Sequence, residues 1–418
     1  MKVIFVSFSD RLGGASIATK RFFEGVSLCS RDIDMSWIVA QKIGNDPFVK
    51  TNTKLESALH FCLRVMVLLM SKLQLSRNKH KHSLNIFSMP GLNRLVGRGG
   101  DIIHLHWINN ETVSLRRLRQ LSRLASKVVI TLHDEWWLGG SEHFPDPVRV
   151  QDGYLRHNHR GAGVDFDRWR FREKVHLMKT INPNVVFTVP SSQMYNAVKA
   201  SKLLSGCRVS LIPNVLGADL LEVSPDKQTL DFIKANISKQ DFVLCFGAIG
   251  GLGNNLKGGQ MLKSALDALA AQKPQEIVLL TFGAGKKGKT QVGGYQVLNL
   301  GYLDHVSKVK AVLSQALVTV VPSYYESFGQ VAAESLVAGT PVIAYKKTGV
   351  VDIVEHKKTG FLFDDYSEMA LISCLEEAMN LGSCGLEKMG EYGRNEVVRK
   401  FSSENISKQL LDLYADIL

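Results

Sequence analysis

Several absences limit what this 418-residue sequence can encode. No two of its six cysteines form a Cys-x-x-Cys pair, so the sequence predicts neither a zinc site nor a disulfide framework. The apolar run at residues 65–70 is far shorter than the roughly 20 residues that span a bilayer. Residues 2–8 form a strand-length run that leads into a Gly-Gly loop, which is not the pattern of a signal peptide. The sequence therefore predicts a cytosolic location and reduced thiols.

Acidic residues are scarce in one stretch of the chain. The sequence has 51 Lys and Arg against 39 Asp and Glu, a net charge of +12. Between residues 55 and 100, the acid Glu56 stands against seven basic residues, which are Arg64, Lys72, Arg77, Lys79, Lys81, Arg94 and Arg98. A basic, partly apolar surface suits peripheral contact with an anionic membrane. A solvated basic face over a core helix is the alternative, and nucleic-acid binding is less favoured because no recognition motif accompanies the charge.

The chain alternates predicted strands and helices throughout, which is typical of parallel α/β sheets. Strands are predicted at residues 2–8, 35–40, 101–106, 127–133, 184–189, 208–213, 242–246, 276–282, 295–300, 317–321 and 341–345. The polar segment 217–240, which has helical parts, is predicted to cross between domains. We therefore predict two Rossmann-like domains, residues 1–216 and 217–402, with a C-terminal helix at 403–418 that packs back on the first.

Two glutamates bracket a polar loop and the helix that follows it. Glu326 lies at the start of the loop, and Glu334 lies inside a helix predicted at residues 330–338 with Gly339 as its C-terminal cap. The start of this helix presents backbone N–H groups that suit an anion, those of Phe328, Gly329 and Gln330. Two carboxylates beside an anion site suit a ligand that is part sugar and part phosphate. The alternative is an ordinary strand–helix connection with one solvated and one capping glutamate.

These glutamates, followed by Ser335-Leu-Val-Ala-Gly-Thr-Pro-Val-Ile-Ala344, resemble the donor-site signature of retaining GT-B glycosyltransferases of family 4 (group 1). Segments 348–354 and 358–363 continue the pattern in the same order. The resemblance implies a GT-B fold, two Rossmann-like domains that face a central cleft. It also implies that Glu326 approaches the donor sugar and that Glu334 binds the ribose hydroxyls of the nucleotide.

The resemblance implies further donor-binding residues. Lys257, which precedes a predicted helix, would hold the diphosphate together with the amides that follow Ser327. Tyr302 would lie near the base. The family usually carries an Arg shortly after the preceding strand, whereas residues 248–253 contain none. One of the two cations expected at the diphosphate is therefore missing.

Segments of the first half resemble the members of that family that build bacterial surface polysaccharides. Residues 131–136 have the sequence Thr-Leu-His-Asp-Glu-Trp, in which His133 matches the family histidine near the donor sugar. A polar strand end is the alternative for His133, and the cysteine-bearing acceptor loop of those enzymes is absent. Gly13 and Gly14 follow the first strand, where small residues allow donor or acceptor to approach the backbone closely. A simple helix start is the alternative there.

Three other motifs do not by themselves predict a further activity or a metal site. Residues 283–290 match the P-loop pattern, but the residues that follow are strand-like rather than helical, so a solvated basic loop between two strands is predicted. Asp165-Phe-Asp167 resembles a metal-binding Asp-x-Asp motif, and a helix N-cap is the simpler interpretation. Two histidine pairs are spaced i, i+2, at residues 80/82 and 104/106. We predict no metal site and no cofactor.

The sequence thus predicts a retaining, metal-independent glycosyltransferase in which His133 and Glu326 orient the donor sugar. Its donor would be a nucleotide-sugar, and its acceptor a hydroxyl of a saccharide or of a polyprenyl-linked saccharide, in exopolysaccharide or lipopolysaccharide biosynthesis. The protein would be cytoplasmic, with peripheral contact at the inner face of the plasma membrane and no nucleic-acid partner. The alternatives are a P-loop nucleotide hydrolase or kinase that uses residues 283–290, and a non-catalytic sugar-binding protein.

Overall fold

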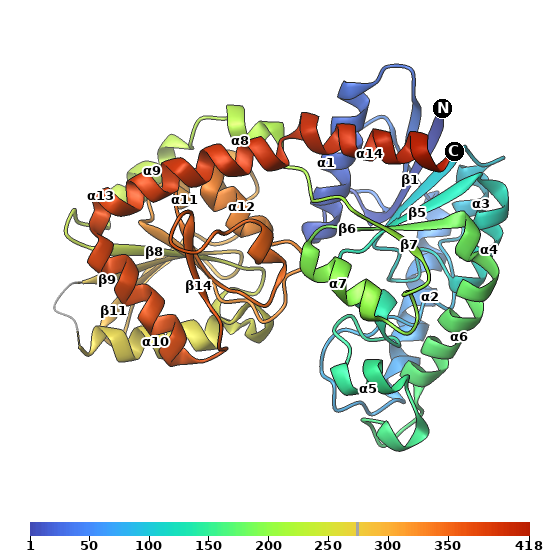
Figure 1. Cartoon of the computed structure of the whole chain (residues 1–418), viewed down its shortest axis with the longest axis horizontal. Helices are drawn as coiled ribbons and strands as arrows, with labels where there is room; N and C mark the ends of the chain where they lie inside the picture. The colour runs from blue at the N-terminus through green and yellow to red at the C-terminus, as the bar shows by residue number, and fades with distance from the viewer. Residues whose placement is uncertain (273–275) are drawn as a thin grey trace. The chain divides into compact units, whose positions relative to one another are not determined.

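A computed structural model describes residues 1–272 and 276–418, and the chain divides into two compact units (Figure 1). Unit 1 comprises Met1–Val215 and Ile406–Leu418, and unit 2 comprises Leu216–Asn405. Each unit contains a seven-stranded sheet over the described residues. The predicted class, two α/β domains built on largely parallel sheets, is confirmed.

Unit 1 is an entirely parallel sheet with the strand order β3-β2-β1-β4-β5-β6-β7. Its strands are β1 (Lys2–Ser9), β2 (Asp34–Gln41), β3 (Val49–Thr51), β4 (Ile102–His106), β5 (Lys127–Thr131), β6 (Val185–Val189) and β7 (Arg208–Leu211). Its helices are α1 (Gly13–Cys29), α2 (Lys54–Lys72), α3 (Leu92–Val96), α4 (Leu115–Leu124), α5 (Pro147–Asp152), α6 (Phe166–Ile181), α7 (Ser192–Ala200) and the greater part of α14 (Ser403–Ile417).

Side chains of unit 1 alternate between the two faces of the sheet, because successive residues of a strand point in opposite directions. Ile4 and Val6 of β1 belong to the core cluster that contains Leu118 and Leu121 of α4. Phe5 points to the other face, where its ring meets Phe23 of α1 edge-on at 5.5 Å between centroids. Both faces of the sheet are therefore covered, as expected for a parallel sheet.

Unit 2 repeats this plan with the strand order β10-β11-β9-β8-β12-β13-β14, in which only β10 runs antiparallel to its neighbour among the described residues. Its strands are β8 (Phe242–Gly247), β9 (Ile277–Phe282), β10 (Gly288–Val292), β11 (Tyr295–Asn299), β12 (Val318–Val321), β13 (Val342–Tyr345) and β14 (Gly360–Phe363). Its helices are α8 (Ala218–Glu222), α9 (Lys227–Lys234), α10 (Gly259–Ala270), α11 (Val306–Leu313), α12 (Gln330–Val337) and α13 (Glu368–Phe401).

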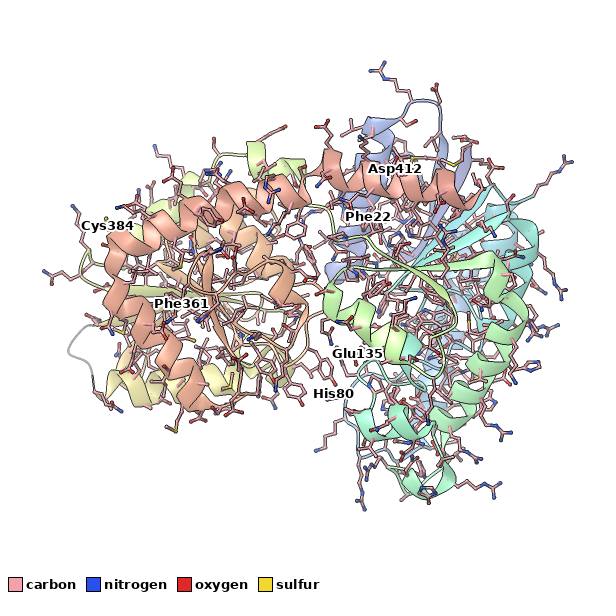
Figure 2. The ribbon with its side chains drawn as sticks, in the orientation of Figure 1. Phe22, His80, Glu135, Phe361, Cys384 and Asp412 are labelled. Carbon is pink, nitrogen blue, oxygen red and sulfur yellow. The ribbon has the colours of Figure 1, made fainter. Side chains whose placement is uncertain are left out.

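The two faces of the unit 2 sheet have separate cores. Leu244 of β8 and Phe361 of β14 belong to a cluster with residues of α10 and α13, and Figure 2 shows Phe361 inside the unit. Val243 and Cys245 belong to a second cluster with residues of α9 and α11. Strand β8 is thus buried on both sides, which explains its uninterrupted apolar sequence.

Three details differ from the sequence predictions. The strand predicted at 127–133 ends at Thr131, because Asp134 turns the chain by accepting a hydrogen bond from the Trp136 amide at 3.0 Å. The strand predicted at 208–213 ends at Leu211, and Pro213 has no N–H to continue a ladder. Strands β3 and β14 were not predicted, since three or four residues are too few to show an alternating pattern.

The segment 217–240 has the helical parts that were predicted for it. It contains α8 and α9, and the Lys310 ammonium of α11 donates hydrogen bonds to three carbonyls at the end of α8, those of Leu220, Leu221 and Val223. These bonds satisfy carbonyls that a short helix leaves without partners. Across the described residues, the helices are too short or too polar for any of them to traverse a bilayer.

The C-terminal helix α14 completes unit 1 through one buried tyrosine. The Tyr414 hydroxyl lies 2.6 Å from Nδ1 of His104, and Nε2 of His104 lies 2.7 Å from the Thr131 hydroxyl. Tyr414 and His104 are both fully buried. Burial also lowers the pKa of His104 to about 3, so its ring is neutral and needs both hydrogen bonds.

We predict that Tyr414→Phe lowers the free energy of unfolding of unit 1 by roughly 1–3 kcal/mol, because it leaves a buried ring nitrogen of His104 without a partner. Urea unfolding would measure the difference. Tyr392→Phe is the matched control, since Tyr392 lies exposed on α13. An unchanged midpoint for Tyr414→Phe would show that α14 is not held by this bond.

Candidate functional site

The loop that carries Glu326 joins β12 to α12 in unit 2, and glycine sets its geometry. Gly329 caps α12 with φ +105°, and a Cβ there would come within 2.7 Å of Cγ2 of Val350. Gly339 follows the helix with φ +83°. Both positions fall in the left-handed region that glycine tolerates best. The predicted helix at 330–338 and its Gly339 cap are confirmed to within one residue.

Lys257 and Glu326 are brought together by this loop. The Lys257 ammonium lies 2.5 Å from Oε1 of Glu326, and the Ser323 hydroxyl donates to the same oxygen at 2.9 Å. Lys257 ends a short 3-10 turn whose N-cap, Asn254, accepts a hydrogen bond from the Lys257 amide at 3.2 Å. A cation and an anion 69 positions apart in the chain therefore share one place in unit 2.

Backbone contacts fix the two loops against each other. The Tyr324 amide donates to the Leu256 carbonyl at 2.9 Å. Gly258 has φ +73°, and a Cβ there would meet the Pro322 carbonyl oxygen at 2.1 Å. The close approach requires glycine after Lys257, so the Lys-Gly pair has a steric reason as well as an electrostatic one.

Glu334 lies in the second turn of α12. Its Oε1 accepts a hydrogen bond from Nε2 of Gln330 at 3.2 Å. Phe328 is anchored instead of exposed, because its ring packs edge-on against Phe401 at 5.4 Å between centroids. Phe328 can thus offer a ligand its backbone only. Residues Ser327 and Phe328 lead into α12, which begins at Gln330 with Gly329 as its N-cap, as an anion site at a helix N-terminus requires.

Tyr302 lies apart from these contacts. It follows Gly301, whose carbonyl accepts a hydrogen bond from the Gly283 amide at 2.8 Å. The Tyr302 side chain is 71% exposed. The structure therefore gives Tyr302 the exposure that stacking on a base requires, and its role stays a prediction.

In unit 1, His133 follows β5 and contacts a second histidine. Its Nε2 lies 3.0 Å from Nδ1 of His106, the last residue of β4. Burial lowers the pKa of His133 to about 4, so the imidazole is neutral near pH 7. A neutral ring suits a hydrogen bond to an uncharged sugar better than a contact with an anion.

The loop after His133 is held from inside by a buried lysine. The Lys174 ammonium donates hydrogen bonds to the carbonyls of Trp136, Gly139 and Gly140, and it lies 3.5 Å from the centroid of the Trp136 ring. Burial lowers its pKa well below the usual value. Sequence analysis did not single out Lys174, because a lysine in a helix usually belongs to a solvated face.

Asp134 and His143 of the same loop form a hydrogen-bonded series with Ser83, which lies between α2 and α3. Nδ1 of His143 lies 2.6 Å from Oδ2 of Asp134, and its Nε2 lies 2.8 Å from the Ser83 hydroxyl. The order matches that of a hydrolase triad, but Ser83 is only 6% exposed and Asp134 also accepts from the Trp107 indole at 2.7 Å. We interpret these hydrogen bonds as contacts that stabilise the loop after His133.

Gly13 and Gly14 begin α1 in unit 1. Gly13 has φ +80°, and a Cβ built at either glycine would meet nothing within 4 Å. Crowding therefore does not require glycine here, and the positive φ of Gly13 is the local reason for it. The backbone at this helix start is open to a ligand.

The P-loop alternative is wrong. Residues Gly288–Val292 form β10, which pairs antiparallel with β11, and no helix follows Thr290 to hold a phosphate. The predicted solvated loop is correct for residues 283–287 only, because Lys289 lies in a strand. β10 is an edge strand and mostly exposed, which explains its polar sequence.

The Asp-x-Asp motif has structural partners. Asp165 caps α6 by accepting from the Arg168 amide at 3.0 Å, as predicted. Asp167 is buried among Ser141, His82 and Arg149, with Nδ1 of His82 at 3.2 Å from its Oδ1. Over the described ranges 1–272 and 276–418, the structure contains no group of three or more His, Cys, Asp or Glu side chains arranged to hold a metal ion.

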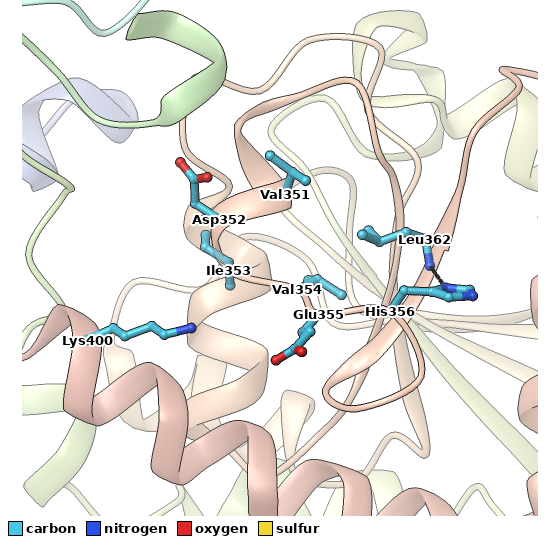
Figure 3. A pocket seen from close by; sticks show the side chains of 8 residues that line it. All are labelled: Val351, Asp352, Ile353, Val354, Glu355, His356, Leu362 and Lys400. Carbon is cyan, nitrogen blue, oxygen red and sulfur yellow. Dashed lines mark hydrogen bonds between the residues drawn. The ribbon is translucent and has the colours of Figure 1, made fainter.

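A cavity of about 290 Å³ opens beside the segment that follows β13 in unit 2 (Figure 3). It is lined by Val351, Asp352, Ile353, Val354, Glu355, His356, Leu362 and Lys400, and the predicted site residues do not line it. Nδ1 of His356 accepts a hydrogen bond from the Leu362 amide at 3.0 Å. The start of this segment contacts the loop that carries Glu326, where the Gly349 amide donates to the Glu326 carbonyl at 2.8 Å.

Comparison with known families supports the group of candidate site residues in unit 2. The model of the family described as glycosyl transferases group 1 matches residues 226–396, which include Lys257, Glu326 and Glu334. A relative from Staphylococcus aureus, the capsular polysaccharide biosynthesis glycosyltransferase CapM, is 32% identical over 120 residues, 29% of this chain and 31% of the relative. The chain matches only 30–40% of the length of such curated relatives.

Solved structures share the fold of the whole chain. Sucrose-phosphate synthase from Thermosynechococcus elongatus superposes with a TM-score of 0.66 at 20% identity, covering 100% of this chain and 98% of the other. Anabaena HepE, solved in complex with UDP and glucose, gives 0.62 at 17% identity with both chains fully covered at 100%. The chain therefore shares the two-domain α/β fold of these proteins, the GT-B fold.

We predict that Lys257→Ala weakens binding of a nucleoside diphosphate by more than about tenfold, whereas Lys289→Ala leaves it within about threefold of wild type. Lys257 lies beside Glu326 at a helix start, while Lys289 lies on the exposed edge strand β10. Isothermal titration with UDP, GDP and ADP would measure both. The opposite ranking would mean that the phosphate lies near residues 283–290 after all.

Proposed function

We propose that the protein is a retaining glycosyltransferase that uses a nucleotide-sugar, because residues 226–396 match the family described as glycosyl transferases group 1. The observation that carries the proposal is the contact between Lys257 and Glu326 beside the start of α12. It puts a cation, a carboxylate and a helix N-terminus in one place. A sugar diphosphate offers the matching groups, anionic oxygens and hydroxyls.

In the proposed complex, Lys257 and the amides from Ser327 to Gln330 bind the diphosphate. Glu334 binds the ribose hydroxyls, Tyr302 lies near the base, and Glu326 orients the donor sugar. His133 of unit 1 donates a hydrogen bond to that sugar. Metal and cofactor have no part in the proposal, because Lys257 and the helix N-terminus supply the positive charge.

The proposed reaction retains the configuration at the anomeric carbon. The bond from that carbon to the diphosphate oxygen breaks, and a bond to the acceptor hydroxyl oxygen forms on the same face of the sugar. The proton of the acceptor hydroxyl passes to the leaving phosphate oxygen. The protein contributes positioning and charge stabilisation, so it needs no side chain as a nucleophile.

We propose a saccharide acceptor linked to a lipid, in the assembly of a surface polysaccharide. The role that CapM has in capsular polysaccharide biosynthesis supports a polysaccharide product. Helix α2 of unit 1 supports contact with a lipid surface, because its solvent side is apolar. Nine large apolar side chains between residues 55 and 75 are exposed, which are Leu55, Leu59, Phe61, Val65, Met66, Leu68, Leu69, Leu73 and Leu75.

The inner side of α2, in contrast, buries a polar side chain, that of His60. The two buried residues of the helix are His60 and Val67, and Nε2 of His60 lies 3.0 Å from the Glu111 carbonyl. The acid of this region, Glu56, pairs with Arg94 at 2.6 Å. Exposed cations occur at the end of α2 and in the residues that follow it, among them Lys72, Arg77 and Lys79. An apolar helix face bordered by cations fits an anionic bilayer surface, on which the helix would lie in the interfacial plane.

We predict that a panel of nucleotide-sugars contains at least one that raises the melting temperature, since a ligand that binds the folded state stabilises it. Glu334→Gln should weaken binding of that nucleotide-sugar and of its nucleoside diphosphate by roughly tenfold or more, because a hydrogen bond to a charged group is lost. Glu326→Gln should slow transfer more than it weakens binding of the nucleoside diphosphate.

The matched control is Glu368→Gln, at the start of α13 and outside the proposed site. Transfer rates and melting temperatures of the three variants would be measured together. If Glu326→Gln and Glu334→Gln both transfer sugar at the wild-type rate, the proposed donor site is wrong.

We predict that binding to phosphatidylglycerol vesicles weakens as salt rises and that replacing Lys72, Arg77 and Lys79 by Gln weakens it further. Each cation near an anionic surface contributes about 1 kcal/mol, and the attraction fades within a Debye length. Leu68→Ser with Leu69→Ser should lower vesicle binding about tenfold or more even at low salt, because fully burying one leucine is worth roughly 1.5–3 kcal/mol.

Leu28→Ser is the control, since Leu28 is exposed at the end of α1. Vesicle sedimentation would measure the bound fraction. Equal binding of the Leu68/Leu69 double variant and wild type would exclude α2 as the contact.

A further inference from the structure

His106 is buried in an apolar setting that leaves one of its nitrogens without a partner. Its ring stacks on Phe5 at 5.5 Å with an angle of 9° between the planes, and the ring of His104 lies 4.1 Å away. Nδ1 lies 3.0 Å from Nε2 of His133. Nε2 of His106 is buried with no hydrogen-bond partner. The ring therefore has one polar contact, the one with His133.

The rings of His106 and His133 are both neutral, so the hydrogen bond between them contains one proton. Burial lowers the pKa of His106 well below its usual value and that of His133 to about 4. Burial likewise lowers the pKa of neighbouring His104 to about 3. A neutral imidazole has one N–H and one unprotonated nitrogen, so one ring donates and the other accepts.

The two possible arrangements differ in what they leave buried. If His133 donated, the proton of His106 would lie on Nε2, a buried N–H with no acceptor. The parallel face of Phe5 would not accept it, because the N–H lies in the plane of its own ring. If His106 donates from Nδ1, its buried Nε2 is an acceptor without a donor. Buried N–H groups without partners are rarer in proteins than buried acceptors without partners.

We propose that His106 is a positioning residue that keeps the proton of His133 on Nδ1. His133 then accepts from His106 through Nε2 and presents Nδ1–H as a donor. The His133 ring makes no other hydrogen bond within unit 1, all of whose residues the structure describes. This inference rests on the proposed function, in which His133 faces the donor sugar. The fixed proton makes the site select a sugar oxygen that accepts a hydrogen bond at that position.

The network behind His106 supports this role. His104 is fixed at both nitrogens, by Tyr414 and by Thr131, and the Thr131 hydroxyl lies 2.6 Å from that of Thr188. His104 therefore has no hydrogen-bonding capacity left for His106. The proton on Nδ1 of His106 can go only to His133.

The proposal is tested by determining which ring nitrogen of His133 carries the proton. Two-bond proton–nitrogen correlation spectra of protein labelled with 15N-histidine distinguish the protonated from the unprotonated ring nitrogen, and His133→Gln and His106→Asn assign the signals. We expect Nδ1 of both His133 and His106 to carry the proton near pH 7.5. A proton on Nε2 of His133 in the wild-type protein would overturn the proposal.

Two substitutions distinguish a positioning role of His106 from a role in packing alone. His106→Asn keeps an amide N–H close to the place of Nδ1, and His106→Leu removes it. We expect His106→Leu to shift the His133 proton towards Nε2 and to lower kcat/KM for the nucleotide-sugar about tenfold or more, as the loss of one hydrogen bond would. His106→Asn should keep the wild-type tautomer and stay within about threefold. Affinity for the free nucleoside diphosphate should not change in either variant.

The outcomes of this test and of the proposed function are distinguishable. If His133→Gln transfers sugar at the wild-type rate, the role of His133 fails, whatever the tautomer. If the His133 proton lies on Nδ1 in His106→Leu as well, His106 does not fix it and the inference fails, while the donor site in unit 2 stands. Should His106→Leu not fold, the wild-type spectrum and His106→Asn still decide.

Discussion

Parallel pairing of neighbouring strands is the constraint on which both groups of candidate site residues depend. The carboxyl ends of parallel strands meet at one edge of a sheet, so the loops after neighbouring strands meet as well. Strands β8 and β12 are neighbours in unit 2, and the loops that follow them bring Lys257 to Glu326. Strands β4 and β5 are neighbours in unit 1, and their ends bring His106 to His133. In both units the contacts join residues that are distant in the sequence because the sheet order makes them adjacent.

Much of this could be predicted from the sequence, because the strands of both units are buried apolar runs separated by helices. The strands around Glu326 and the helix that carries Glu334 were predicted to within a residue or two, since glycine and proline mark their ends. The end of β5 was not, because Leu132 and His133 are as compatible with a strand as with a turn. The assignment of residues 283–290 depends on β10, a polar edge strand whose pairing with β11 no local pattern reveals.

Side-chain partners were the least predictable part. The spacing of His104 and His106 indicates one face of a strand, but not that Phe5, Phe22 and Tyr414 cover that face. Lys174 resembles a surface lysine in the sequence, although its ammonium binds three carbonyls inside unit 1. The outward apolar face of α2 also contradicts the usual rule, since periodicity alone places apolar residues towards the core. Each of these depends on contacts between elements that the sequence leaves unspecified.

The two units offer different kinds of hydrogen-bonding groups, and the difference follows from burial. In unit 2, Lys257 and Glu326 are only partly buried and form an ion pair. In unit 1, His104 and His106 are buried and His133 is partly buried, and burial lowers the pKa of all three rings, which keeps them neutral. A charged diphosphate needs counter-charge, whereas a sugar hydroxyl needs only a correctly placed donor or acceptor. In the proposed function, the charged contact in unit 2 would therefore serve the diphosphate, and a neutral histidine of unit 1 would serve a sugar hydroxyl.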